Sequence, residues 1–220
     1  QPIEHAADGS LPLEKLAAAV KPKGDPHYAR TRLLALENTF QGKVIPAAYI
    51  DQAAHFAPEH GLGLHLDGAR VFNAAVASGR TAHDVCAPFD SVSICFSKGL
   101  GAPVGSVLVG SKALIDEARR WRKVLGGGMR QSGFLAAACL HALDHHVQRL
   151  AQDHENAALL AEGLRGIEGV KVLAHDTNMV FAEFAPEHTE KLSQALQEQD
   201  IIIRAIYRGP TRLVTHLDVS

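Results

Sequence analysis

The fold is decided by the stretch Leu62–Gly110, LGLHLDGARVFNAAVASGRTAHDVCAPFDSVSICFSKGLGAPVGSVLVG. It predicts a strand, a helix, a second strand, a glycine-rich turn and a third strand. Side chains alternate between the two faces of a strand, so Leu62, Leu64 and Leu66 share one face and Asp67 lies on the other, at the carboxyl end. A strand–helix–strand order of this kind is typical of α/β domains.

The second predicted strand carries another apolar row. Val92, Ile94 and Phe96 lie on one face, and the same alternation extends this row to Lys98, where the apolar run stops. Ligands of open α/β sheets bind in the crevice outside the carboxyl ends of the strands. We therefore expect the carboxylate of Asp67 and the amine of Lys98 to face one cleft.

An amine and a carboxylate in one cleft indicate a particular chemistry. Burial lowers the pKa of a lysine, and the neutral amine forms a Schiff base with a carbonyl compound. Pyridoxal 5'-phosphate (PLP) is a carbonyl cofactor whose sites pair such a lysine with an acid that keeps the pyridine nitrogen protonated. A carboxylate about 4 Å from that nitrogen is worth roughly 4 kcal/mol at an effective dielectric constant near 20. Lys98 and Asp67 suit these roles; a solvent-facing lysine and a helix-capping or turn aspartate are the alternatives.

Four motifs run through essentially the whole chain in a familiar order. They are His65-Leu66-Asp67-Gly68-Ala69-Arg70, Ser97-Lys98-Gly99-Leu100-Gly101, Gly127-Gly128-Met129-Arg130-Gln131 and Arg212-Leu213-Val214-Thr215-His216. Together they closely resemble low-specificity L-threonine aldolases. The likeness begins well inside that family's chain and stops before its final helix, so we interpret the 220 residues as an internal segment of a longer protein.

The resemblance implies an α/β fold of the PLP-dependent transferase type, the aspartate aminotransferase fold type I. It divides the chain into a large PLP-binding domain, residues 1–148, and a small C-terminal α+β domain, residues 149–220. It also implies the reaction, which is cleavage of L-threonine, L-allo-threonine and related β-hydroxy-α-amino acids to glycine and an aldehyde. The family's phosphate-binding glycine and hydroxyl residue, and its ring-stacking histidine, are expected outside this segment.

The resemblance also assigns residues to the substrate. Arg70 and Arg212 match the arginines that grip the amino-acid carboxylate, with Arg70 also near the cofactor, because a guanidinium meets a carboxylate with two parallel hydrogen bonds. Arg204 and Arg208 are rival candidates. His27 matches a histidine near the substrate hydroxyl, where an imidazole can accept a proton at neutral pH. Surface salt bridges and an ordinary loop histidine remain the alternative interpretations.

Lys123 and Arg130 flank the flexible run Gly126-Gly127-Gly128. Two cations beside such a turn suit a phosphate, and in the resembling family the corresponding loop reaches the cofactor of a neighbouring subunit. This implies a homo-oligomer, a dimer or tetramer with shared sites. A solvated basic patch is the alternative.

The sequence departs from the family at Phe40-Gln41, where a histidine-asparagine pair usually follows Glu-Asn-Thr.

Composition restricts the class of protein. The 220 residues are 46% hydrophobic with a formal net charge of −2, which gives no reason to expect nucleic acid or an anionic membrane as partner. Three cysteines without metal-type spacing favour reduced thiols and the cytoplasm. His141 and His145 lie one helical turn apart but lack a third ligand, so we expect no metal site.

Periodicity predicts the remaining elements. Helices are expected over residues 11–20 and 46–60, after Ser111 with Leu114, Ile115 and Ala118 inward, and from Ser132 to about Arg165 with a bend near 144–153. A short buried strand is expected over residues 33–36. The small domain is expected to contain strands 170–174, 179–184, 201–206 and 212–217 and a helix over 187–199.

Two other hypotheses stay open at this point. The chain could catalyse another reaction on the same fold, as a transaminase, lyase or desulfurase does. It could also be an inactive segment or homologue with a binding or assembly role. Aldehyde release from threonine, amino transfer to a keto acid and PLP binding by Lys98 distinguish the three.

Overall fold

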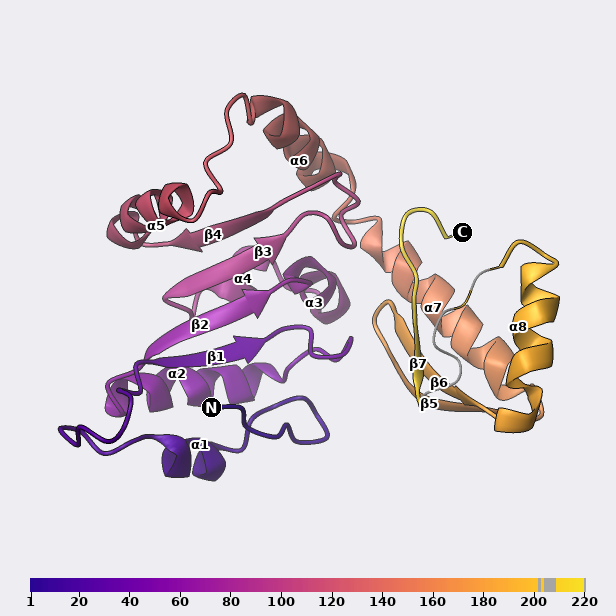
Figure 1. Cartoon of the computed structure of the whole chain (residues 1–220), viewed down its shortest axis with the longest axis horizontal. Coiled ribbons are helices and arrows are strands. Elements are labelled where there is room, and N and C mark those ends of the chain that lie inside the picture. Colours follow the sequence, from indigo (N-terminus) through magenta and orange to yellow (C-terminus); the bar gives the residue numbers. More distant parts are fainter. Residues whose placement is uncertain (202, 204–208, 220) are drawn as a thin grey trace.

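The computed structural model describes residues 1–201, 203 and 209–219, which form two sheets (Figure 1). The larger sheet has the order β1-β2-β3-β4, with the first three strands parallel and β4 antiparallel to β3. Its strands are β1 (Leu33–Glu37), β2 (Gly63–Gly68), β3 (Ser91–Cys95) and β4 (Ser106–Gly110). The parallel register puts the carboxyl ends of β1, β2 and β3 at one edge of the sheet, as expected.

The helices of this half begin and end at recognisable signals. They are α1 (Leu13–Ala19), α2 (Ala47–Glu59), α3 (Val71–Ser78) and α4 (Ala82–Cys86). Pro46 is the N-cap of α2, and the helix ends at Glu59, two residues before Gly61, which has a left-handed φ of +69°. Gly79 ends α3 in the left-handed conformation, with φ of 64°. Helix α4, which the sequence analysis missed, is capped by the hydroxyl of Thr81.

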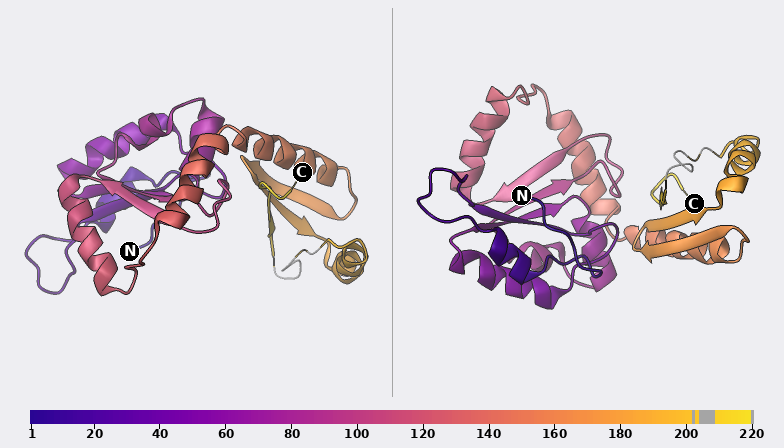
Figure 2. Two further views of the ribbon diagram at one scale, coloured as in Figure 1. Left: turned by 90° about the horizontal axis from the view of Figure 1, so that it is seen from above. Right: turned by 60° about the horizontal axis from the view of Figure 1, so that its bottom comes forward.

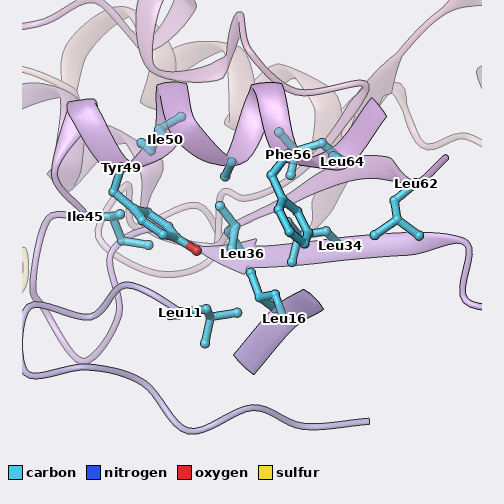
Figure 3. Close-up of a cluster of buried hydrophobic side chains, with 12 residues drawn as sticks. Leu11, Leu16, Leu34, Leu36, Ile45, Tyr49, Ile50, Phe56, Leu62 and Leu64 are labelled. Atoms are coloured by element: carbon cyan, nitrogen blue, oxygen red, sulfur yellow. The ribbon is translucent and has the colours of Figure 1, made fainter. Parts of the chain in front are cut away.

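One face of α2 covers β1 and β2. Tyr49 and Phe56 of α2 point toward Leu36 and Leu34 of β1 in Figure 3, within a larger buried cluster that includes Ile50. The opposite face of β1 is not covered in the same way, because Leu33 is exposed. The expectation of a fully buried strand here was therefore wrong: β1 is the edge strand of the described sheet, with alternating burial.

The other edge of the large sheet is far less covered. It consists of β4, α5 (Lys112–Val124) and α6 (Gly133–His145). Ser111 caps α5 as expected, its hydroxyl accepting a hydrogen bond from the amide of Leu114 at 3.3 Å. The expected inward orientation of Leu114, Ile115 and Ala118 is met only in part: Ile115 and Ala118 are half-buried and Leu114 is exposed, and among the described residues no side chain of α5 is fully buried. The hydrophobic period of a helix shows which of its faces is apolar, but not which element packs on that face.

The smaller sheet is antiparallel with the order β5-β6-β7. Its elements and flanking helices are α7 (Leu150–Arg165), β5 (Val170–Asp176), β6 (Met179–Phe184), the 3₁₀ helix η1 (Pro186–His188), α8 (Thr189–Gln197) and β7 (Thr211–Val214). Figure 2 shows the two sheets side by side, with α7 lying on the smaller one. Helices α6 and α7 separate within the predicted bend. The domain boundary at residues 148/149 stays a prediction, and most of the predicted strand 201–206 lies outside the described residues.

Two properties of the chain bear on its environment. All three cysteines, Cys86, Cys95 and Cys139, carry free thiols, as expected. None of the helices in the described part of the chain is both long enough and apolar enough to cross a membrane.

Candidate active site

Two carboxylates meet where β1 and β2 end. Glu37 pairs with Asp67 in the parallel register, and the amide of Asn38 donates to the carbonyl of Asp67 at 3.0 Å. One carboxylate oxygen of Asp67, Oδ1, accepts a hydrogen bond from the amide of Ala69 at 3.0 Å, in the turn into α3. The exposed Asp67 is thus fixed at the carboxyl edge of the sheet, as the alternation predicted.

Glu37 is a site residue that the sequence analysis missed. It is half-buried, and burial raises its pKa, with a further increase from the negative charge of Asp67. Lys98 and Arg70 act in the opposite direction and lower the pKa of Glu37. The four charged groups therefore lie close enough to influence one another. The available signal was that Glu37 ends an apolar strand at the same edge as Asp67.

Lys98 lies in the turn that follows β3. The strand ends at Cys95, so the apolar row does not extend to Lys98 as expected: Phe96 is buried while the lysine side chain is exposed. The amide of Gly101 donates to the carbonyl of Lys98 at 2.9 Å and closes the turn. Gly101 has φ of +68°, a conformation that glycine adopts at low cost. Lys98 thus reaches the carboxyl edge from a turn rather than from a strand.

The structure brings Arg70 and Arg212 together from the two sheets. Arg70 is at the N-cap position of α3, and Arg212 is in β7, paired with Phe181. Burial lowers the pKa of Arg70, and the positive charge of Arg212 lowers it further, whereas Glu37 raises it. Two like charges at one site, one of them half-buried, provide a place for a carboxylate.

The buried side of Arg70 supports this interpretation. Its Nε atom is buried and has no hydrogen-bond partner among the described residues. A buried donor without a partner costs free energy, so this atom is suited to receive an acceptor from a ligand. The rival candidates Arg204 and Arg208 lie outside the described residues.

His27 lies elsewhere. Its side chain is 87% exposed, and its Nδ1 lies 2.9 Å from Oδ1 of Asp25. The loop between α1 and β1 that carries it lies at the amino end of β1 in Figure 1. Asp67 and Lys98 lie at the opposite edge, so one copy of the chain does not bring His27 to them.

Lys123 and Arg130 are also separate from Lys98. Both are exposed, and the side chain of Lys123 lies against Gly128. They precede the amino end of α6, whereas the far end of that helix contacts the turn of Lys98 through His146 and Leu100. A helix of 13 residues is about 20 Å long, which separates this loop from the lysine turn.

A cavity of about 800 Å³ runs along β1 between the strand, α1 and the N-terminal segment. Glu37 and Asp67 line one end of it. Lys98, Arg70 and Arg212 are not part of its lining. The charged cluster therefore shares Glu37 and Asp67 with this cavity but is not the cavity itself.

The residues present fit PLP at its aldehyde and ring. Lys98 supplies an exposed amine, Asp67 a carboxylate whose second oxygen is not used by the Ala69 amide, and Arg70 a buried donor without a partner. In the described part of the chain, no cluster of three or more histidine, cysteine, aspartate or glutamate side chains is arranged to hold a metal ion.

Comparison with known proteins gives the same family as the motifs. The low specificity L-threonine aldolase of Escherichia coli (strain K12) is 52% identical over 100% of this chain and 65% of its own length. Low-specificity L-threonine aldolase 1 of Arabidopsis thaliana is 42% identical over 99% of this chain and 63% of its own. The chain thus spans less than two thirds of the length of these relatives.

A solved structure of the threonine aldolase of Leishmania major superimposes with a TM-score of 0.75. It is 22% identical, and the match covers 98% of this chain and 64% of that chain. The expected fold, the PLP-dependent fold type I with an α/β mixed sheet, is therefore confirmed. The profile of the beta-eliminating lyases matches residues 1–187. The chain belongs to the beta-eliminating lyase family.

Proposed function

We propose that the protein is a PLP-dependent aldolase that cleaves L-threonine, L-allo-threonine and related β-hydroxy-α-amino acids to glycine and an aldehyde. The observation that carries the proposal is the convergence of an amine, a carboxylate and two guanidinium groups at one edge of the sheet, from Lys98, Asp67, Arg70 and Arg212. The motifs and the 52% identity to an L-threonine aldolase support the substrate class.

Each residue has a part in this reaction. Lys98 would hold the cofactor through its Nζ atom. Asp67 keeps the pyridine nitrogen protonated, and PLP, when bound, supplies an electron sink for the broken Cα–Cβ bond. Arg70 and Arg212 would hold the substrate carboxylate and thereby fix the orientation of the Cα–Cβ bond. The orientation of that bond selects cleavage over the other reactions of the same cofactor.

Three proposed roles depend on a second copy of the chain. The proton of the substrate hydroxyl is accepted by His27 or by a base outside this segment. His27 would act from a neighbouring copy, because its loop lies at the amino end of β1. Lys123 and Arg130 likewise bind the cofactor phosphate across an interface, since α6 separates them from Lys98. A homo-oligomer, a dimer or tetramer with shared sites, follows from these assignments. Three free thiols favour a reducing compartment, and we propose the cytoplasm.

The test is chemical trapping on Lys98. The protein is incubated with PLP and reduced with borohydride, and peptide mass spectrometry locates the added group. We expect it on Lys98, with acetaldehyde released from threonine, and we expect Lys98→Ala to abolish both, a loss of at least about 10³-fold. Lys112→Ala, at an exposed lysine on α5, is the matched control and should retain both.

Other results identify the remaining hypotheses. Trapping on Lys98 with amino transfer to a keto acid, and without aldehyde release, favours a transaminase of the same fold. Failure to trap Lys98 at saturating PLP contradicts the proposal and favours a binding or assembly role.

A further inference from the structure

The backbone that carries Lys98 is fixed although its side chain is exposed. The Lys98 turn, residues 97–101, is closed by two hydrogen bonds. The amide of Gly101 donates to the carbonyl of Lys98 at 2.9 Å, and the amide of Ala102 donates to the carbonyl of Phe96 at 3.0 Å. Leu100 is buried in a cluster with Ala142 and Leu150, so the turn is also anchored by an apolar side chain.

One polar side chain holds this turn from outside. His146 is the residue at which α6 ends, and its Nδ1 lies 2.6 Å from the carbonyl oxygen of Leu100. In Figure 1 the carboxyl end of α6 lies beside the connection between β3 and β4. A carbonyl oxygen only accepts hydrogen bonds, so Nδ1 carries the proton and donates it.

The bond acts on the part of the turn that determines where the amine lies. Leu100 follows Lys98 by two residues. It directly precedes Gly101 and Ala102, whose amides donate the two hydrogen bonds that close the turn. Gly101 lies against His146 as well, since a Cβ atom at this glycine would be 3.9 Å from Nδ1. Without the donor, the half-buried carbonyl would lose a partner, and the turn could move relative to Asp67.

We propose that His146 is a positioning residue for Lys98: its Nδ1–H holds the Leu100 carbonyl and thereby keeps the amine at the distance from Asp67 that the cofactor requires. The inference rests on the proposed function of Lys98 as the amine that binds PLP. It assigns no proton transfer to His146, which acts only through the turn.

The chain offers closely matched variants. In His146→Asn the side-chain amide nitrogen is attached to Cγ like Nδ1, so the donor is kept, whereas His146→Leu puts a methyl group there. His145 is the neighbouring control. It is exposed, and its ring lies against His141 with centroids 4.4 Å apart, while the His141 ring lies edge-on to that of His146 with centroids 5.4 Å apart. His145→Leu makes the same chemical change without removing the bond to Leu100.

Two measurements separate the turn from the chemistry. The first is hydrogen exchange of the Gly101 and Ala102 amides without PLP, which reports opening of the turn. The second is the rate at which PLP and borohydride label Lys98, relative to Lys112 in the same sample. We expect His146→Leu to speed exchange at both amides about 10-fold and to slow labelling of Lys98 by about 10- to 100-fold. His146→Asn and His145→Leu should stay within about 2-fold of the unmodified protein in both measurements.

Each result supports or contradicts the inference. Unchanged exchange and labelling in His146→Leu would overturn it. An equal loss in His146→Asn would also overturn it, because the imidazole would then matter for a reason other than the donor. If PLP and borohydride do not label Lys98 in the unmodified protein, the proposed function fails. Faster exchange of the Gly101 and Ala102 amides in His146→Leu would still show that His146 stabilises the turn.

Discussion

The large sheet has two halves that differ in how well they are covered. The packed half consists of β1, β2 and β3 with α2, α3 and α4, and it contains two buried clusters. In one of them, Leu66 and Val71 are fully inaccessible to solvent. The open half consists of β4, α5 and α6, and it exposes large apolar side chains such as Leu125 at 80% and Phe134 at 87%. All five residues of β4 are exposed.

The charged groups follow this division. Asp67, Arg70 and Glu37 are attached to the packed half, where neighbouring strands and a helix terminus fix their backbones. Lys123 and Arg130 belong to the open half. The difference teaches that, under the proposed function, one chain supplies the amine, the ring partner and the arginines for the carboxylate, whereas the proposed phosphate ligands lie in the less covered half of the sheet.

The largest expected effect is chemical and concerns the packed half. Asp67→Asn removes the charge that keeps the pyridine nitrogen protonated, so kcat/KM for threonine cleavage should fall about 10³-fold, consistent with roughly 4 kcal/mol for that contact. Asp51→Asn, on the exposed face of α2, is the control and should change little. Lys123→Ala should reduce kcat/KM less than Asp67→Asn does. An equal loss in Lys123→Ala would break the comparison between the halves.

The next effect concerns stability and uses one substitution in both halves. Leu66→Ala removes a fully buried side chain and should lower the free energy of unfolding by about 3 kcal/mol. Leu125→Ala, at a side chain that is 80% exposed, should change it by less than about 0.5 kcal/mol. Urea denaturation measures both. A cost at Leu125 similar to that at Leu66 would mean that the open half is covered in the protein in solution.

The smallest expected effect is the pH dependence of Glu37. Because burial and Asp67 raise its pKa in the folded state, the ionised carboxylate costs stability, and this cost is present above its ordinary pKa of about 4.5. Glu37→Gln should therefore increase the free energy of unfolding at pH 7 by less than about 1 kcal/mol, since the group is half-exposed. This increase in the free energy of unfolding should disappear as the pH falls below the ordinary pKa of glutamate, because the carboxyl of Glu37 is then protonated in both the folded and the unfolded state.

Denaturation at several pH values checks this, with Glu155→Gln on the exposed face of α7 as the control. A stabilisation by Glu37→Gln that persists at acid pH would show that packing, and not charge, is responsible. The sign is informative by itself: a lower stability of Glu37→Gln at pH 7 would mean that Lys98 and Arg70 outweigh burial and Asp67.

Much of the fold was predictable from short-range patterns. Alternation along β2 identified its buried leucines and put Asp67 at the carboxyl end, and Ser111 was correctly identified as a helix cap. The same patterns overestimated the burial of α5, because an amphipathic period shows which side of a helix is apolar and not how closely anything covers it. They also extended β3 too far, since alternation does not indicate where a strand gives way to a turn.

The sequence by itself determined the order of the elements, the four motifs and therefore the family, because these depend on residue types and on spacing along the chain. Only the tertiary structure decided which groups meet. It brought Arg212 to Arg70 from the other sheet, put Glu37 beside Asp67, kept His27 at the opposite edge and set His146 against the Lys98 turn. The physical reason is that proximity between distant residues arises from the packing of whole strands and helices, which no local period encodes.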